Sequence, residues 1–574
     1  MPFRFRRDTC DTRDSHAPRS TPAGRGGRPR RAEALVLAAL TLLAAAASAT
    51  LVPAQAHAAS TTSATTSTAS TKSTAAKASA SSVSNTDVTL TMSDGTGLAG
   101  ILTQPSTPGP HPAIVFISSW GLPDFEYYDQ AQQFAADGYI VLEYDPRGFY
   151  NSGGTIDVAS PQDVADVSTV ITWLLANSSA NPAEIGVGGV SYGAGLSLLA
   201  AAHDPRIKAV ASMSTWTDLD YSLYPNDTRH QESTDLLVAA GELTGRLSPD
   251  FENILSDFYA DKNVPDVLQW GAVRSPQTYI NQINANGTAV FISNGLQDSI
   301  FAPNQLTPFY NDLTTPKYLM LQPGDHATAE ASGLLGLSNT VWTNAHAWFD
   351  HYLTGADNGI NTQDPVQVEP VGGSSYEGYP NLSALSTSTA TFQLGGTNWL
   401  GTGSLSYAAP GTWSTGINVG TATCASGGTL EVSGLLTQLL DLPPQCWLPV
   451  IDRGDAAVWQ SNAMTSEQKL RGTASINLTF TPSASSGTLY AYLYDVNWAD
   501  DGTLISYVPY SYLNATPGQP MTINAQFITA AYDIPSGDSI AVVVGTKDPL
   551  FLDSDQSGST VTFGGPSSVT LPLD

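Results

Sequence analysis

The feature that most restricts the fold of this chain is an alternation of short apolar runs with amphipathic segments between residues 87 and 357. One amphipathic segment, residues 160–177, opens with Ser160, Pro161 and Asp163, which is the pattern of a capped helix start with a capping box. Apolar strands that alternate with helices are typical of a parallel sheet covered on both faces. The pattern therefore predicts an α/β domain with a doubly wound sheet. The runs expected to form strands read "AIVFI", "YIVLEYD", "IGVGGV", "IKAVASM", "AVFISNG" and "KYLMLQ".

Two further regions differ from this alternation. Residues 217–275 interrupt it with helical patterning, and we expect a helical cap that forms a lid over the strand ends. Beyond residue 358 the apolar residues recur with period two, as in "SINLTF" and "MTINAQF", between turns rich in Gly, Pro and Asn. This predicts a C-terminal all-β domain over residues 358–574, a β-sandwich or jelly roll. A chain of 574 residues is long enough for several such domains.

The first 58 residues are typical of a signal peptide. An arginine-rich start precedes the run "ALVLAALTLLAAAASA", and small residues then allow cleavage after Ala56 or Ala58. An uncleaved membrane anchor is the less favoured alternative, because the run is shorter than the roughly 20 apolar residues of a span. Residues 59–86 are rich in Ser, Thr and Ala and are expected to form a disordered spacer. We therefore expect a secreted protein, extracellular or periplasmic, with no membrane insertion after signal cleavage.

The chain is strongly acidic, with 51 Asp and Glu against 23 Lys and Arg and a formal net charge of −28. Removal of the arginine-rich signal would make this excess of negative charge larger. Nucleic acid and anionic membrane surfaces would be repelled, so we exclude both as partners.

Two cysteines remain once Cys10 leaves with the signal. Cys424 and Cys446 lie in one Gly- and Pro-rich region, and an oxidising compartment favours a disulfide between them. Two sulfurs without a nearby His are too few ligands for a metal site. We expect the disulfide, no metal and no organic cofactor.

The segment "IGVGGVSYGAG", residues 185–195, contains the pattern G-x-S-x-G around Ser191. In this motif a strand passes abruptly into a helix and exposes a nucleophilic serine, and its glycines are needed because side chains would collide in so sharp a turn. The five-residue pattern alone is common. Here an apolar strand precedes it and a small-residue helix follows it, so we interpret Ser191 as a nucleophile rather than as part of a structural turn.

A serine nucleophile needs a base and an orienting carboxylate, which follow on this fold in the order Ser, Asp or Glu, His. His326, in "LMLQPGDHA", comes directly after a predicted strand and is the best base. Asp298, in "FISNGLQDSIFAP", ends the preceding strand and is the best acid. Asp325 competes as the acid, but neighbours in sequence rarely face each other well enough to orient a ring.

The oxyanion of acyl transfer needs two N–H donors on such a fold, one after the nucleophile and one after an earlier strand. The first is expected from Tyr192. The second is expected from Trp120 in "FISSWG", with Ser119 as the alternative. Arg147, in "EYDPRGFYNSGG", is expected to brace the loops around the nucleophile.

Taken together, these motifs resemble the α/β-hydrolase family that unites Xaa-Pro dipeptidyl-peptidases with cocaine-esterase-like acyl hydrolases. The resemblance covers about residues 87–565 and rests on "YDPRGFYNSGG", "GGVSYGAG", "STWTDLDYSLYP", "NGLQDSIFAP", "PGDHA" and "LYAYLYDVNWADDG". It implies a hydrolase domain, a helical cap, a jelly-roll domain beside the active site, and Ser191, Asp298 and His326 as the catalytic triad. The oxyanion loop departs from many relatives, which carry a His-Gly pair or a Tyr there.

The substrate is less narrowly defined. Trp216, Tyr221, Tyr224 and Trp270 are candidates to line an acyl pocket, and the cap has 11 acidic residues against four basic ones. The sequence thus predicts a secreted serine hydrolase similar to Xaa-Pro dipeptidyl-peptidases, and the expected partner is a small-molecule ester or peptide substrate. A carboxylic ester hydrolase is one alternative. A cell-surface binding protein with a decayed hydrolase domain is an alternative of another class.

Overall fold

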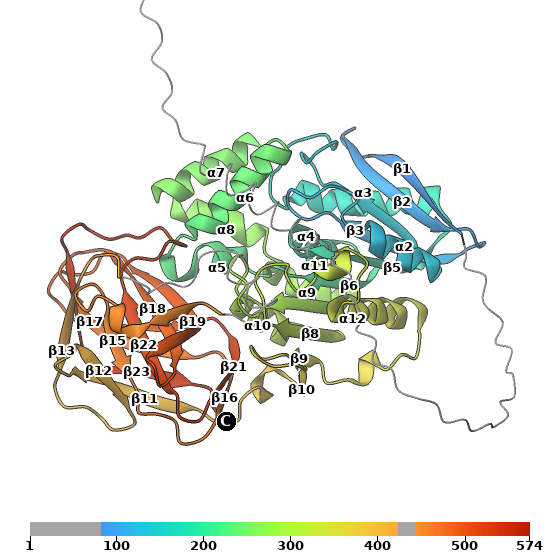
Figure 1. The fold of residues 1–574 in the computed structure, drawn as a ribbon. Coiled ribbons are helices and arrows are strands. Elements are labelled where there is room, and N and C mark those ends of the chain that lie inside the picture. Colours follow the sequence, from blue (N-terminus) through green and yellow to red (C-terminus); the bar gives the residue numbers. More distant parts are fainter. Residues whose placement is uncertain (1–81, 423–442) are drawn as a thin grey trace, which may run out of the picture.

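The structure is a computed structural model and describes residues 82–422 and 443–574. Its first domain is built on a ten-stranded mixed sheet with the strand order β1-β2-β4-β3-β5-β6-β7-β8-β9-β10 (Figure 1). Pairing is parallel from β4 to β9 and antiparallel at both edges. The strands are β1 (Val83–Thr91), β2 (Gly97–Pro105), β3 (His111–Ile117), β4 (Ile140–Tyr144), β5 (Ala180–Val190), β6 (Ile207–Met213), β7 (Ala289–Gly295), β8 (Lys317–Gln322), β9 (Val366–Val368) and β10 (Glu377–Tyr379).

Helices cover both faces of this sheet, which explains why its central strands are apolar on both sides. One face packs against α3 (Pro161–Asn177), α4 (Tyr192–His203), α9 (Ile280–Asn286) and α10 (Leu306–Asp312). The other packs against α2 (Tyr128–Ala136) and α12 (Thr340–Phe349), with the short α11 (Ala331–Leu334) nearby. The predicted capping box at the start of α3 is present. The prediction of an α/β doubly wound sheet is confirmed.

Residues 217–275, between β6 and β7, contain four α-helices and the segments that join them: α5 (Leu219–Leu223), α6 (Gln231–Thr244), α7 (Pro249–Ala260) and α8 (Val264–Val273). They are the green helices of Figure 1, beside the sheet and on the side of the C-terminal domain. We call residues 217–275 the cap.

The C-terminal domain is all-β, as predicted. Ten strands of its main sheet follow the order β14-β19-β18-β22-β15-β12-β11-β23-β17-β20, β13 pairs with β23, and β16 pairs separately with β21. β17 alternates buried and half-buried positions, with Ile476, Leu478 and Phe480 inside. The strands are β11 (Ala390–Thr397), β12 (Thr402–Ser406), β13 (Ser414–Asn418), β14 (Gln445–Trp447), β15 (Ala457–Gln460), β16 (Gln468–Gly472), β17 (Ser475–Pro482), β18 (Gly487–Val496), β19 (Asp501–Tyr512), β20 (Met521–Gln526), β21 (Ala530–Ile534), β22 (Ser539–Gly545) and β23 (Thr560–Leu571).

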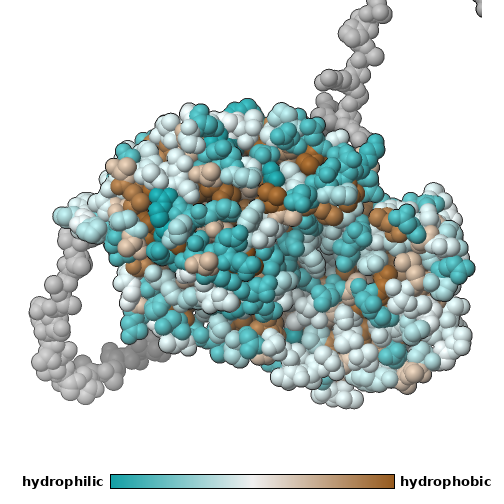
Figure 2. All heavy atoms as spheres, turned by 180° about the vertical axis from the view of Figure 1, so that it is seen from behind, coloured by the Kyte–Doolittle hydropathy of each residue, from teal (hydrophilic) through white to brown (hydrophobic). Residues whose placement is uncertain are grey.

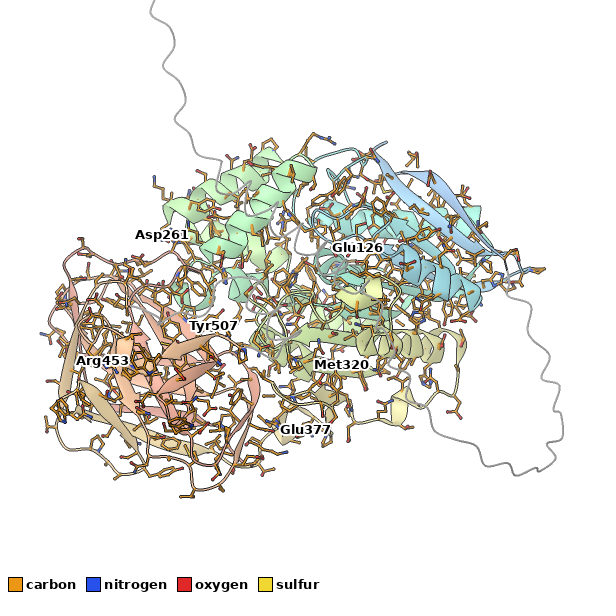
Figure 3. The ribbon with its side chains drawn as sticks, in the orientation of Figure 1. Glu126, Asp261, Met320, Glu377, Arg453 and Tyr507 are labelled. Atoms are coloured by element: carbon orange, nitrogen blue, oxygen red, sulfur yellow. The ribbon has the colours of Figure 1, made fainter. Side chains whose placement is uncertain are left out.

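The β-domain is hydrogen-bonded to three parts of the catalytic half. The side chain of Asn304, just after the β7 loop, donates to Phe527 O at 2.7 Å and accepts from Thr529 N at 2.6 Å. In the cap, the side chain of Asn226 donates to Pro509 O at 3.0 Å. At the sheet edge, Nε of Arg471 lies 2.7 Å from Glu377, which Figure 3 labels at the junction of the two domains.

The exterior in Figure 2 is mainly hydrophilic, and apolar side chains show only in separate patches. Within the described residues, no helix is both long and apolar enough to cross a membrane.

Two boundaries differ from those expected. β1 begins at Val83, inside the segment expected to be a disordered spacer, because its first residues pair in register with the end of β2. The α/β sheet continues through β9 and β10 to Tyr379, beyond the expected limit at residue 357. The signal peptide, the earlier part of the spacer and Cys424 lie outside the described residues. Cys446 is buried on β14, and its pairing with Cys424 stays a prediction.

Candidate active site

Ser191 occupies a sharp turn between β5 and α4. Its φ of 55° and ψ of −115° are strained for a residue with a side chain, and its N–H is held by the carbonyl oxygen of Met213 at 2.8 Å. The glycines of the motif are required by close backbone contacts. A Cβ at Gly193 would collide with the carbonyl oxygen of Ile117, and a Cβ at Gly189 would lie 2.7 Å from the same atom. The local sequence therefore presents the hydroxyl of Ser191 at the end of the sheet.

The structure brings the three predicted triad residues together. Oγ of Ser191 lies 2.8 Å from Nε2 of His326, and Nδ1 of His326 lies 3.0 Å from Oδ2 of Asp298. Oδ1 of Asp298 accepts hydrogen bonds from the N–H groups of Ile300 and Phe301. Asp298 is completely buried, and the ring of Phe301 packs edge-on against the imidazole. Ser191, His326 and Asp298 thus form a continuous hydrogen-bonded chain.

Asp325, the competing acid, does not contact the imidazole through its carboxylate. Its Oδ1 accepts the N–H groups of Ser299 and of His326, both at 2.7 Å. Burial, with a further effect from the charge of Asp298, raises the pKa of Asp325 to about 7. The carboxylate holds the backbone of the two loops that carry His326 and Asp298.

A second buried carboxylate, Glu330, lies behind the histidine loop and was not anticipated. It accepts hydrogen bonds from Ser214 Oγ at 3.1 Å and Ser293 Oγ at 2.7 Å, and Ser214 Oγ in turn accepts the N–H of Ala327. Burial raises the pKa of Glu330, while the neighbouring His326 lowers it. Only tertiary structure joins these residues, so no local pattern in the sequence marks them.

Two backbone N–H groups are available to an oxyanion beside Ser191. Tyr192 is the first residue of α4, and the N–H groups of a first helical turn have no partner within the helix. The N–H of Trp120 has no acceptor among the residues that the structure describes. The N–H of Ser119, the alternative donor, is occupied by Glu126. The arrangement favours Tyr192 and Trp120.

A cavity lies between Ser191 and the cap. Its walls are largely aliphatic and aromatic side chains of the cap and of the catalytic domain. Trp216, Tyr224 and Trp270 line it, as predicted. The other apolar residues in its wall include Trp120, Leu219, Leu237, Phe251, Ile254, Phe258, Leu268 and Phe301.

Tyr221 does not line this cavity, which corrects the sequence prediction. Leu219, Asp220, Leu223 and Tyr224 share the face of α5 that borders the cavity. Tyr221 lies on the opposite face and borders a separate cavity at the junction with the β-domain. A helix of only five residues is too short for its sequence to show which side chains face the cavity.

Asp220 contributes the one carboxyl group among the residues that line the cavity, although the cap as a whole is acidic. Burial, with a further effect from Asp218, raises its pKa to about 7. The cavity can therefore accept a mainly apolar group, with Asp220 available for a polar or cationic contact.

Arg147 binds two carboxylates, Asp94 at 2.8 Å and the buried Asp166, and so ties the loop after β4 to the β1–β2 turn and to α3. This is the bracing role expected from the sequence. Among the residues that the structure describes, no group of three or more His, Cys, Asp or Glu could hold a metal ion.

Two family models match consecutive parts of the chain. One is described as X-Pro dipeptidyl-peptidase (S15 family) and matches residues 94–328; the other, the X-Pro dipeptidyl-peptidase C-terminal non-catalytic domain, matches residues 314–568. Together the two matches span residues 94–568, and the chain belongs to the family that unites Xaa-Pro dipeptidyl-peptidases with cocaine-esterase-like acyl hydrolases. The family resemblance seen in the sequence is confirmed, and this protein is a hydrolase of the serine type.

Relatives of this family member carry both peptidase and esterase names. A putative Xaa-Pro dipeptidyl-peptidase from Streptomyces avermitilis is 20% identical over 535 residues, which cover 78% of this chain and 72% of that protein. A cocaine esterase from a Rhodococcus species is 24% identical over 465 residues, 72% of this chain and 80% of that protein.

Two other matches differ in extent. A polyketide transferase from a Penicillium species is 29% identical over 194 residues, 33% of this chain and 63% of that protein's length. The solved structure of an aminopeptidase from a Thaumarchaeota archaeon has a TM-score of 0.67 at 14% identity, and the match covers 88% of this chain and 99% of that chain. The last match shows a common fold.

Proposed function

We propose that this protein cleaves acyl bonds by a Ser-His-Asp acyl-enzyme mechanism. His326 takes the proton of Ser191 through Nε2 as Oγ attacks the carbonyl carbon of the substrate, and Asp298 stabilises the resulting imidazolium through Nδ1. His326 then returns the proton to the leaving group, and the carbon–leaving group bond breaks to give the acyl-enzyme. Water, activated by the same imidazole, releases the acid. The hydrogen-bonded chain from Ser191 to Asp298 is the observation that carries this proposal.

The tetrahedral intermediates carry a negative oxygen in each half of the reaction. The N–H groups of Tyr192 and Trp120 would stabilise it, and removal of one such donor typically costs about 10²- to 10³-fold in kcat. The apolar cavity excludes water from these dipoles, so their interaction with the oxyanion is stronger than it would be in bulk solvent.

The walls of the cavity favour a carboxylic ester with a bulky apolar acyl group as substrate. The aromatic and aliphatic side chains of these walls come from the cap as well as from the catalytic domain, so the cap contributes to acyl selection. Each methylene of the acyl group that leaves water there contributes about 0.8 kcal/mol. We expect kcat/KM to rise along a series of p-nitrophenyl esters from acetate to octanoate.

A peptide that begins with Xaa-Pro is the second candidate substrate, and Asp220 is the observation that favours it. A dipeptidyl-peptidase must hold a free α-ammonium group at a fixed distance from the nucleophile. Asp220 lies on the wall of the same cavity as Ser191 and is ionised to a substantial degree at neutral pH, given a pKa of about 7. An ammonium group beside it would lower that pKa and stabilise the charged form.

Asp220→Asn separates the two candidates. The variant should lose Xaa-Pro-anilide cleavage by about tenfold or more and retain hydrolysis of neutral p-nitrophenyl esters. Cleavage of Xaa-Pro-anilides at the original rate would remove Asp220 as the ammonium contact. The absence of any anilide cleavage by the unmodified protein would leave the ester hydrolase alone.

Ser191→Ala tests the mechanism itself. The purified protein should react with a fluorophosphonate probe, and the variant should lose both labelling and turnover while unfolding at the same temperature. An unmodified protein that is not labelled and turns over no acyl substrate would favour the binding-protein alternative, and binding to cell-wall polysaccharide would then test the β-domain.

We also propose that the protein is exported and that its signal peptide is removed by cleavage after Ala56 or Ala58. The arginine-rich start, the apolar run and the small residues before His57 and Ala59 support this. Sequencing the N-terminus of protein from the culture medium or periplasm should find His57 or Ala59 first, and an intact Met1 there would contradict it.

A further inference from the structure

Glu126 makes an unusual contact with the loop that carries Trp120. It lies between β3 and α2, and Figure 3 labels it within the α/β domain, well apart from the β-domain. Its two carboxylate oxygens bind the same residue. Oε2 accepts the N–H of Ser119 at 2.7 Å, and Oε1 accepts the hydroxyl of Ser119 at 2.6 Å. A two-point contact of this kind fixes both the position and the rotation of Ser119.

The peptide group between Ser119 and Trp120 is also held at its carbonyl end. Ser119 O accepts the N–H of Leu122 at 3.1 Å. In a trans peptide the N–H points away from the C=O of the same unit, so this contact sets the direction of the Trp120 N–H. The contacts of Ser119 with Glu126 and with Leu122 therefore restrict the N–H of Trp120 to a single orientation.

The same contact links the loop to the turn of the nucleophile. The hydroxyl of Ser119 lies 2.9 Å from the carbonyl oxygen of Val190, the residue before Ser191. Tyr127, next to Glu126, accepts the N–H of Val190 at 2.8 Å and donates to Ile117 O at 3.1 Å. The loop and the end of β5 are thus joined by adjacent residues of one segment.

We infer that Glu126 is a positioning residue for the oxyanion hole: by holding Ser119 at its N–H and hydroxyl, it aims the N–H of Trp120 at the oxyanion formed on Ser191. This inference rests on the proposed function. Glu126 is not a catalytic residue, because it acts through Ser119 and makes no contact with Ser191.

The contact is compatible with both protonation states of Glu126. Burial raises its pKa to about 7, so both states occur near neutral pH. When Glu126 is protonated, Oε1 can donate to Ser119 Oγ, whose own proton then turns to Val190 O. A glutamine can copy the protonated form, because its amide oxygen accepts from the Ser119 N–H while its NH₂ donates to the hydroxyl.

Two variants of Glu126 test the inference with an ester substrate and with an alkyl trifluoromethyl ketone as inhibitor. The hemiketal that this ketone forms with a nucleophilic serine places a negative oxygen in the oxyanion hole, whereas KM for the ester reports mainly the acyl pocket. Glu126→Ala should lower kcat about 10- to 100-fold and leave KM within about threefold. Inhibition by the ketone should weaken by the same factor as kcat/KM. Glu126→Gln should restore kcat and ketone inhibition to within about threefold of the original.

Glu143→Gln is the matched control. Glu143 is a fully buried neighbour of Glu126, and no hydrogen bond joins it to Ser119 among the described residues. Its replacement should leave kcat, KM and ketone inhibition unchanged. If Glu126→Ala unfolds, Ser119→Ala replaces it; that variant keeps the N–H contact and should lose about three- to tenfold in kcat alone, and an unchanged kcat would overturn the inference.

The remaining outcomes are distinct. Unchanged kcat and ketone inhibition in folded Glu126→Ala would overturn the positioning role. Equal losses in Glu126→Ala and Glu126→Gln would also overturn it, because the amide keeps the geometry. Failure of the unmodified protein to react with the fluorophosphonate probe would instead reject the proposed function.

Discussion

Replacing Asp298 with Asn changes the tautomer of His326. The N–H groups of Ile300 and Phe301 approach Oδ1 at 3.0 and 2.7 Å, while Oδ2 faces Nδ1 of the imidazole. An amide has only one oxygen, and the two backbone donors retain it at the Oδ1 position. The amide nitrogen must then face Nδ1 and donate to it. The neutral imidazole consequently carries its proton on Nε2, where it can no longer accept the proton of Ser191.

The expected loss is large and confined to the chemical step. Such an exchange in another Ser-His-Asp enzyme lowers kcat about 10⁴-fold, and this corresponds to about 5.5 kcal/mol in activation free energy. Asp298 is completely buried and does not border the acyl cavity, so KM should remain within about threefold.

Asp325→Asn is the matched control for this experiment. Asp325 is also buried and also receives two backbone N–H groups on Oδ1, but its carboxylate does not touch the ring. We would measure ester hydrolysis per site titrated with a fluorophosphonate, together with thermal unfolding. Asp325→Asn should keep kcat within about tenfold. The reasoning is refuted if Asp298→Asn retains kcat within tenfold, or if the control loses as much.

Three other changes have defined outcomes. Burial raises the pKa of Glu143 to about 9 from an ordinary value near 4.5, so its contribution to stability is present below pH 4.5 and lost as pH rises toward 9. Glu143→Gln should therefore be more stable than the original at pH 7, by at most about 3 kcal/mol. The difference should disappear at pH 4.5 in urea unfolding, and an equal difference at both pH values would disprove this. Gly193→Ala should abolish turnover because a Cβ collides with Ile117 O, so normal kcat in a folded variant would contradict the turn geometry. Asn304→Ala breaks both hydrogen bonds to the β-domain and should cost about 1–3 kcal/mol in unfolding free energy, and an unchanged midpoint of denaturation would show that these bonds contribute nothing.

The sequence predicted those parts of the fold and site that local pattern controls. Period and turn residues identified the parallel sheet, the cap and the β-domain, and the strand-turn-helix context of Ser191 identified the nucleophile. His326 and Asp298 could be predicted because each comes directly after a strand of the sheet. Parallel strands bring their carboxyl ends to the same edge of a sheet.

Other features depend on long-range packing and could not be read in this way. Glu126 and Glu330 lie in segments with no motif, and their partners Ser119, Ser214 and Ser293 belong to other elements. Tyr221 was misplaced because a helix as short as α5 has too few residues for the sequence to show which of its faces borders the cavity. The start of β1 was missed because pairing with β2 stabilises a stretch whose composition alone does not suggest a strand.

The hydrogen bonds of Asn304 have a consequence for how the protein is made. Asn304 follows the loop of Asp298, and its partner Phe527 is synthesised 223 positions later. A nascent chain therefore contains Ser191, Asp298 and His326 long before the last anchor of the Asp298 loop exists. Hydrolase activity would then appear only when the β-domain folds. Chains shortened at the C-terminus would lose it. The domain without catalytic residues would in this way act as an internal check that the polypeptide is complete.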